Sequence, residues 1–366
     1  FGHIYPGPMG LPWTAEVHGL DKAAAYADLC ISCGLCKEIC PAQIDMPLLI
    51  AEIKHEDHKD NPPSLTNRVL MGAEKAAQMG SRFAPLSNWS LRNPLFRWVM
   101  EKAVGIDRRR EMPAFARKTL RDRWAGRSPV VDAKRKVVFF HDIFVNHNEP
   151  ELGMAALKRL ESLGCAVELP EQRASGYPYI GYGDLDAART AAVYNVHHLA
   201  KYAAQGYDIV ATEPTAAYCL KVSYPKLLPH NKDAKLVAEK TREYFAYLLE
   251  IEDGATNESL KGKKFGFHCS CHQRPLGVGE EAMAWVRNQG AEIELIESGT
   301  CCGMGGTFGM KAGALGYDLA NAVGAPLFAS FKESGVEAIV TESSVCSIHL
   351  KEGTGLPLMH PLELLR

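Results

Sequence analysis

Lys264-Phe265-Gly266-Phe267-His268 is a short apolar run that ends in a histidine, and Val137-Val138-Phe139-Phe140-His141 has the same form 127 residues earlier. Helical patterns, at Pro150–Leu163 and Leu185–Ala204, separate such runs. Alternation of this kind predicts α/β layers with largely parallel sheets. We expect six strands: Val137–Phe140, Ala166–Leu169, Asp208–Ala211, Lys264–Phe267, Ile293–Ile296 and Ala338–Thr341.

The recurrence is an internal repeat. The same offset of 127 places Gly176 on Gly303 and Cys219 on Cys346. One offset that fits such widely spaced positions predicts two copies of a single α/β unit, related by approximate two-fold symmetry. We expect the first copy to be residues 134–260 and the second to be residues 261–366.

Only the second copy is rich in cysteine. Cys301 and Cys302 are adjacent and cannot form a relaxed disulfide with each other, but both can ligate a multinuclear centre. Gly303 leaves room for a close backbone approach. The second copy also holds Cys269, Cys271 and Cys346. The corresponding first-copy positions are Asp142, Phe144, Ala174, Ser175 and Cys219. One thiol cannot hold a cluster, so we interpret the first copy as structural.

A second cysteine pattern lies near the start of the chain, in Cys30-x2-Cys33-x2-Cys36-x3-Cys40-Pro41. This spacing is typical of the ligands of a ferredoxin-type [4Fe–4S] cluster. The alternatives are four structural thiols, or a zinc site built from paired Cys-x2-Cys turns. Zinc ribbons usually separate their two pairs widely, whereas three of these cysteines recur at intervals of three. The pattern therefore favours a cluster and electron transfer.

Composition limits the class of protein. The 366 residues are 46% hydrophobic and 23% charged, with a net charge of −2, as in an ordinary globular chain of two or three domains. Eleven cysteines, mostly clustered, argue against a disulfide framework and for a reducing cytoplasm. There is no signal-peptide pattern and no run of eighteen or more apolar residues. The slightly acidic chain has no nucleic-acid-binding motif, so we expect no nucleic-acid partner.

The first third of the chain divides into two expected segments. Residues 1–61 form a ferredoxin-like segment that starts with a Pro/Gly-rich loop, Tyr5–Gly10. Residues 62–133 have helical spacing without strand signals and form a helical connector. The connector ends in a basic stretch, Arg108–Arg127. This stretch is either a solvated helix face or a docking surface for an acidic partner or anionic lipid headgroups.

Several motifs together carry a resemblance to a known family. They are Cys301-Cys302-Gly303, His268-x-Ser270-Cys271-His272, Asn146–Gly153 and Gly303–Gly309. The chain resembles the CCG-domain (cysteine-rich) iron–sulfur oxidoreductases, which include the C subunit of anaerobic glycerol-3-phosphate dehydrogenase, the lactate-utilisation iron–sulfur protein and the D subunit of heterodisulfide reductase. The resemblance implies a mixed α+β and α/β fold: a small ferredoxin-like helical cluster domain, a helical connector and two pseudo-symmetric α/β CCG domains.

The resemblance also implies a ligand set for a second iron–sulfur cluster: Cys271, Cys301, Cys302 and Cys346. Ser343 stands at the first position of the family's final Cys-x2-Cys, so four thiolates remain where five would suit a non-cubane cluster. Cys269 could substitute, or Ser343 Oγ could act as a weak oxygen ligand. A bare redox-active thiol set and a zinc ion remain alternatives. The nearby histidines are either supporting donors and proton carriers or structural residues: His268, His272 and His349.

For function, the resemblance implies an iron–sulfur electron-transfer component. It would accept electrons from a flavin-dependent dehydrogenase of a 2-hydroxyacid, glycerol-3-phosphate or a similar substrate, and relay them towards a quinone or another acceptor. The alternative is a catalytic heterodisulfide or quinone reductase acting at the CCG-domain cluster. The expected partners are a flavoprotein subunit or fused flavin domain and a membrane quinone-reducing subunit. The expected location is cytoplasmic, with peripheral attachment at the inner face of the membrane as a variant. No catalytic residue is identified.

The role of Cys40 depends on what precedes Phe1. In two-cluster ferredoxins the first three cysteines of such a run hold one cluster and the fourth binds the other. Relatives have two such motifs, and this sequence starts without a methionine. We therefore expect an upstream cluster-binding segment or fused flavin domain, whose cluster Cys40 would ligate. Otherwise Cys40 completes a single cubane with Cys30, Cys33 and Cys36.

Overall fold

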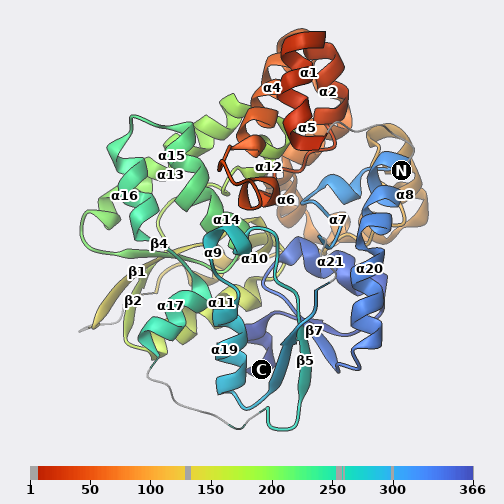
Figure 1. Ribbon diagram of the computed structural model, residues 1–366. Coiled ribbons are helices and arrows are strands. Elements are labelled where there is room, and N and C mark those ends of the chain that lie inside the picture. The colour runs from red at the N-terminus through yellow and green to blue at the C-terminus, as the bar shows by residue number, and fades with distance from the viewer. Residues whose placement is uncertain (1–6, 128–132, 253–257, 259, 298–300, 366) are drawn as a thin grey trace.

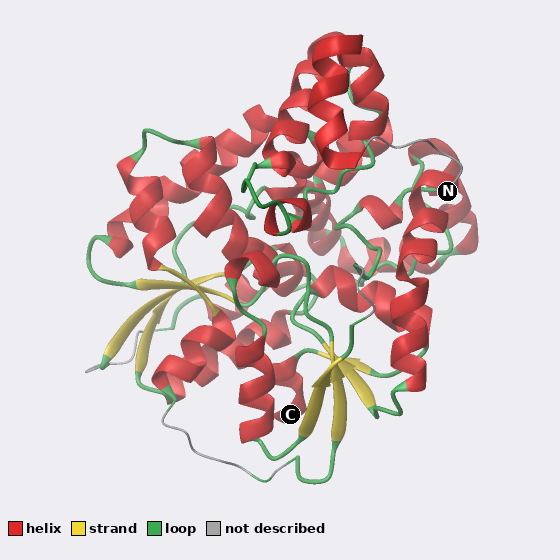
Figure 2. Ribbon diagram, in the orientation of Figure 1, coloured by secondary structure: helices red, strands yellow, loops and turns green. Residues whose placement is uncertain are grey.

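Two parallel β-sheets form the body of the protein (Figures 1 and 2). The computed structural model describes residues 7–127, 133–252, 258, 260–297 and 301–365. The first sheet has the order β2-β1-β3-β4 and the second has the order β6-β5-β7-β8, with every pair parallel. The two halves of the chain therefore build sheets of the same strand order.

The strands confirm the expected alternation. Their bounds are β1 Arg135–Phe140, β2 Cys165–Glu168, β3 Asp208–Ala211, β4 Thr241–Glu243, β5 Lys264–Phe267, β6 Glu292–Leu295, β7 Ala338–Val340 and β8 Leu358–Met359. Each of the predicted strands is present, with ends that differ from the expected bounds by about two residues at most. The edge strands β4 and β8 were not predicted, because they are only three and two residues long.

One hydrophobic core joins the two sheets. Phe139 of β1 and Phe267 of β5 belong to the same buried cluster, together with Trp285. Helices α11 (Pro150–Ser162), α17 (Tyr244–Ile251) and α19 (Glu280–Asn288) fill the layer between the sheets (Figure 1). Because β1 is buried on both faces, its unbroken apolar run is what a central parallel strand requires. The opposite face of the first sheet is covered mainly by helices of its own half, whereas the cluster on the opposite face of the second sheet also contains Leu70, Met71 and Tyr182 from earlier in the chain.

The N-terminal third is helical, as predicted. Its helices are α1 (Gly7–His18), α2 (Leu20–Ala27), α3 (Leu35–Glu38), α4 (Met46–Asp60), α5 (Leu65–Met71), α6 (Ala73–Arg82), α7 (Ala84–Arg92), α8 (Pro94–Val104) and α9 (Leu120–Trp124). Helices α1, α2 and α4 pack around a small core that contains Leu11 and Ile50. The loop expected over Tyr5–Gly10 is wrong in its second half, because α1 begins at Gly7, and residues 1–6 lie outside the described part.

The remaining helices connect the strands. In the first half they are α10 (Ile143–His147), α12 (Tyr177–Tyr182), α13 (Leu185–Ala203), α14 (Pro214–Tyr218), η1 (Cys219–Ser223), α15 (Tyr224–Leu227) and α16 (Lys232–Lys240). In the second half they are α18 (Gln273–Leu276), η2 (Phe308–Met310), η3 (Ala314–Asp318), α20 (Leu319–Glu333), α21 (Ser344–Thr354) and η4 (Pro361–Leu365).

The basic stretch is not a solvated helix face. Most of Arg108–Arg127 is irregular, with one short helix, α9. Arg110 is fully buried and pairs with Glu352, and Arg123 pairs with Glu151. Much of this positive charge is therefore used within the molecule.

Candidate functional site

The first cysteine group lies on the loop between α2 and α4. All four thiols are free and partly buried: Cys30, Cys33, Cys36 and Cys40. Ser32 and Gly34 have positive φ angles of 54° and 83°, which turn the backbone sharply between the cysteines. The Ser32 amide lies 3.4 Å from Cys30 Sγ, and such N–H···S contacts stabilise thiolate ligands.

These thiols are not gathered closely around one point in the described structure. A tetrahedral zinc site, with Zn–S bonds of about 2.3 Å, holds its sulfurs about 3.8 Å apart. Among the described residues, no three of the four N-terminal sulfurs lie within 4.8 Å of one another. Burial raises the pKa of Cys33 to about 12, so this thiol keeps its proton until a metal displaces it. The donor set, four cysteines at this sequence spacing, fits an iron–sulfur cluster.

Residues from distant elements hold this loop in place. Lys54 of α4 is buried and donates to the carbonyl oxygens of Cys30 (2.6 Å) and Gly181 (2.7 Å). The Ser32 carbonyl accepts from the Tyr177 hydroxyl of the first half, and His272 Nε2 of the second half lies 3.4 Å from it. Both halves of the body therefore contact the same peptide of the cysteine loop.

The second cysteine group is gathered where β5 and β7 end. Cys271 follows β5, Cys346 lies in the first turns of α21 after β7, and Cys301 and Cys302 lie between them in the chain. Cys302 Sγ and Cys346 Sγ are 3.3 Å apart, and the Gly303 amide donates to Cys301 Sγ at 3.3 Å. The structure therefore brings together the four cysteines that the resemblance implied.

These four thiols form one hydrogen-bonded chain in the order Cys271, Cys301, Cys302 and Cys346. The hydrogen bond from Cys302 and the nearby His268 lower the pKa of Cys346 to about 5, despite its burial. Contact with Cys271 likewise lowers the pKa of Cys301, while the pKa of Cys271 is raised by that same contact and by burial. Contact between the thiols therefore favours the ionised forms of Cys301 and Cys346. A metal centre binds cysteines as thiolates.

A glycine makes the second group compact. Gly303 has a φ of 90°, and a Cβ there would lie 2.1 Å from the carbonyl oxygen of Ala320. Gly176, its counterpart in the repeat, also has a positive φ, at 77°. The backbone after Cys302 therefore packs directly on α20, and a side chain at 303 has no space.

The two substitute ligands have different surroundings. Cys269 packs against the core between the sheets and close to Gly279, and burial raises its pKa to about 11. Ser343 is buried at the N-cap of α21, one turn before Cys346. Their role as ligands stays a prediction.

The first half has a hydrogen-bonded network at the corresponding place. The Ser175 hydroxyl donates to Asp142 Oδ2 at 2.7 Å, and Cys219 Sγ lies 3.3 Å from the Ser175 carbonyl. Tyr224 and Asn195 complete this network. Its polar groups partner one another, which agrees with a structural role for this half.

Cys30 of the first cysteine group and all four cysteines of the second line one cavity of about 280 Å³. Its walls include Cys30, Cys271, Cys301, Cys302 and Cys346. Cys33 is also close enough for a charge on Cys301 to raise its pKa further. Apolar side chains from α5, α6 and the segment 112–115 form part of the remaining wall, and both halves of the body supply the rest.

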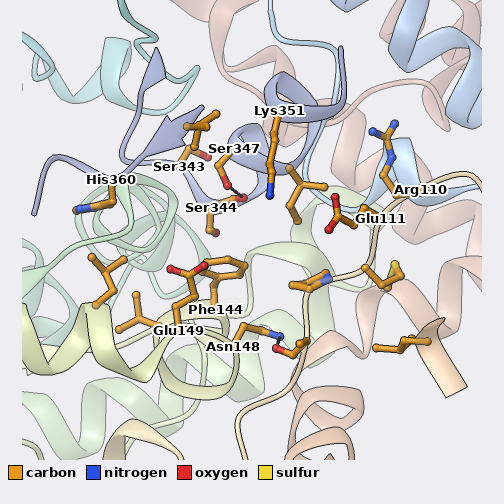
Figure 3. A pocket seen from close by; sticks show the side chains of 18 of the residues that line it. Arg110, Glu111, Phe144, Asn148, Glu149, Ser343, Ser344, Ser347, Lys351 and His360 are labelled. Carbon is orange, nitrogen blue, oxygen red and sulfur yellow. Dashed lines mark hydrogen bonds between the residues drawn. The ribbon is translucent and has the colours of Figure 1, made fainter. Parts of the chain in front are cut away.

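A second, larger cavity of about 690 Å³ adjoins the first between the two halves (Figure 3). Ser343, Ser344 and Glu213 line both cavities. Figure 3 shows Lys351 and Ser347 of α21 across the cavity from Phe144 and Glu149. Glu213 accepts bonds from the Ser344 amide and hydroxyl, yet burial raises its pKa to about 8.

Sequence patterns did not reveal Lys54 or Tyr177, because their partners lie far away in the chain. His268 was expected only as a supporting or structural residue. The structure places one of its ring nitrogens within 4.8 Å of the sulfurs of both Cys302 and Cys346. No comparable group of three metal-binding side chains occurs elsewhere in the described ranges.

Comparison with known proteins gives matches over most of the chain. The CCG family, a cysteine-rich domain, matches residues 265–351. The C subunit of the anaerobic glycerol-3-phosphate dehydrogenase of Escherichia coli (strain K12) is 32% identical over 310 residues, which cover 83% of this chain and 77% of that protein. Lactate utilization protein A of Geobacillus sp. (strain WCH70) is 26% identical over 246 residues, covering 63% of this chain and 98% of that protein.

Proposed function

Because the chain belongs to the family that includes the C subunit of anaerobic glycerol-3-phosphate dehydrogenase, we propose that it is the iron–sulfur electron-transfer component of an oxidoreductase. It takes electrons from a flavin-dependent dehydrogenase and relays them to a quinone or another acceptor. A [4Fe–4S] cluster is held by Cys30, Cys33 and Cys36 with Cys40, or with Cys40 bound to an upstream cluster. A second cluster is held by the CCG-domain cysteines, with Cys269 and Ser343 as alternative ligands.

The observation that carries this proposal is the cavity that Cys30 of the first group shares with the four cysteines of the second. Two clusters held by adjacent parts of one cavity can exchange electrons without a diffusing carrier. The chain offers no nucleophile elbow and no dinucleotide fingerprint, so the flavin chemistry belongs to a partner subunit or fused domain. The first half, without a cysteine group, completes the shared core as the structural member of a pseudo-symmetric pair.

Iron analysis with EPR tests the relay. Anaerobically purified protein should contain about eight iron atoms per chain and give two signals that broaden each other when both centres are reduced. Four iron atoms, or two signals without mutual broadening, would contradict a relay between adjacent clusters. A stoichiometric flavoprotein dehydrogenase with its substrate should reduce both centres, whereas the substrate alone should not.

An exposed apolar face on α7 and α8 supports binding of the protein to a membrane surface. Its exposed side chains are Phe83, Leu86, Trp89, Leu95, Phe96, Trp98 and Val99. The rings of Trp89 and Phe96 are 5.1 Å apart, so the face is continuous across the two helices. The cations around it are Arg82, Arg92 and Lys102, all exposed. Aromatic and aliphatic side chains rimmed by cations suit the surface of an anionic bilayer. None of the helices in the described ranges is long and apolar enough to cross one.

Vesicle flotation tests this location. The protein should float with vesicles that contain anionic phospholipid and less with neutral ones, and the double variant Leu95→Ser with Trp98→Ser should lose binding. Val193→Ser on α13, also an exposed apolar position, serves as the control and should bind normally. If the double variant instead dissociates a dimer and wild-type protein never floats, a second copy covers this face and the membrane location is wrong.

The larger cavity favours a second candidate function, direct reduction of an acceptor at the CCG-domain centre. It is lined by charged and polar side chains, such as Glu149 and Lys351, and reaches Ser343, beside Cys346. Reoxidation of the dithionite-reduced protein by a disulfide or a quinone, without any flavoprotein, would support this function. If Ser344→Trp blocks that reoxidation but leaves reduction by the flavoprotein unchanged, the larger cavity is the entry for the acceptor.

A further inference from the structure

The second cysteine group contains a nitrogen donor that the spacing of the cysteines does not reveal. A ring nitrogen of His268 and the sulfurs of Cys302 and Cys346 all lie within 4.8 Å of one another. All three side chains are buried, with His268 only 5% exposed. Four thiolates from the CCG-domain cysteines leave one position of a five-ligand set without sulfur, because residue 343 is a serine.

The sheet explains why His268 stands at this place. His268 is the first residue after β5, and its amide donates to the Val340 carbonyl of β7 at 2.9 Å. Its own carbonyl accepts from the Thr341 hydroxyl at 3.0 Å. Neighbouring parallel strands end at the same edge, so His268 is fixed beside the start of the segment that carries Cys346.

The imidazole hydrogen-bonds to Cys346, but its two ring nitrogens are not both satisfied in the described part of the chain. His268 Nε2 is buried and has no hydrogen-bond partner there. A buried polar atom without a partner is rare in a folded protein, and a ligand or metal often supplies the partner. His272, by contrast, bonds to Tyr177 and Thr215 through its two ring nitrogens.

We propose that His268 is a direct iron ligand of the CCG-domain centre, taking the place of the thiolate missing at Ser343. This inference rests on the proposed second cluster. Imidazole is a good ligand for iron, and histidine replaces cysteine on one iron of Rieske centres, where it raises the reduction potential. A serine hydroxyl must lose a far more tightly held proton before it can bind iron as strongly.

Pulsed EPR on wild-type protein tests the assignment without a mutation. The measurement is made on the paramagnetic state of the CCG-domain centre. Unlabelled protein should show a strongly coupled ¹⁴N nucleus, and protein grown with ¹⁵N-histidine should show a strongly coupled ¹⁵N nucleus in its place. Weak couplings alone, with the iron present, would overturn the assignment and leave the relay intact. Absence of iron from the CCG domain would overturn both the assignment and the second cluster.

Variants separate a ligand from a residue that only supports the site. His268→Cys should keep the iron and lower the reduction potential, because a thiolate adds negative charge, while His268→Gln should lose iron or the strong nitrogen coupling. His349→Gln is the matched control: His349 is fully buried one turn after Cys346, and it lies outside the three-residue group. The control should keep the strong coupling. If His268→Gln also keeps it, His268 is not a ligand.

Discussion

Replacing Gly303 with alanine tests the geometry of the second cysteine group most directly. The new Cβ would lie 2.1 Å from the Ala320 carbonyl oxygen and 2.9 Å from the Gly324 amide nitrogen, both in the backbone of α20. The φ of 90° adds conformational strain of about 1–3 kcal/mol for a residue with a side chain. Overpacking adds about 1–3 kcal/mol. We expect Gly303→Ala to lower the free energy of unfolding by about 2–6 kcal/mol, the sum of these two costs.

Gly306 provides the matched control three residues later. Its φ is also positive, at 63°, but a Cβ there meets no atom within 4 Å. Gly306→Ala should therefore cost only the strain, about 1–2 kcal/mol. Urea unfolding of both variants gives the difference in the free energy of unfolding, provided that both show the same dependence of this free energy on urea concentration.

Iron content is the second measurement for this pair. Because α20 also lies against Cys302, whose carbonyl would contact a Cβ at Gly324, movement of α20 should displace this ligand. Gly303→Ala should lose iron from the second centre and Gly306→Ala should keep it. Equal destabilisation of the two variants, or full iron in Gly303→Ala, would refute the close packing of this loop on α20.

Three further predictions concern groups around the two centres. Burial raises the pKa of Glu213 to about 8 from 4.5, so the folded protein holds this proton more tightly than the unfolded chain does. Its contribution to stability is present below about pH 4.5 and is lost as the pH rises to about 8. Glu213→Gln should therefore gain stability relative to wild type across this range, by at most about 1.4 kcal/mol per pH unit. Urea unfolding at several pH values measures this gain, and a gain that does not vary with pH would contradict the burial of a protonated carboxyl. Lys54→Met leaves two buried carbonyl oxygens without a donor and should lower the free energy of unfolding by about 2–5 kcal/mol. The exposed control Lys59→Met should lower it by less than about 1 kcal/mol in the same assay. Equal effects would argue against the anchoring of the cysteine loop by Lys54. Cys346→Ala should remove about half of the iron, while Cys219→Ala, in the first half, should remove none; iron loss in Cys219→Ala would show that the first half also holds metal.

Much of the fold could be predicted from the sequence, because a parallel strand buried on both faces needs an unbroken apolar run. Val137–Phe140 and Lys264–Phe267 have this property and are the central strands β1 and β5. Thr241–Glu243 and Leu358–Met359 could not be found this way, because edge strands of two or three residues take their structure from the neighbouring strand.

The candidate site also has features that could be predicted from the sequence and features that could not. The spacing of Cys30, Cys33 and Cys36 is local and is readable in the sequence. The anchoring of that loop by Lys54 and Tyr177 is not, since each contact depends on how distant elements pack. The basic stretch 108–127 shows the same limit: an arginine has the same sequence pattern whether it faces water or pairs with a glutamate from another element, as Arg110 does with Glu352.

The shared contact at the Ser32 carbonyl sets an order for the maturation of this protein. Synthesis delivers the N-terminal cysteines first, and N-terminal segments generally begin to fold first. Yet the peptide between Cys30 and Cys33 is held by Tyr177 and approached by His272, which leave the ribosome much later. The loop therefore reaches its final shape only after most of the chain has been made. An isolated N-terminal fragment would therefore lack the contacts that shape its cysteine loop.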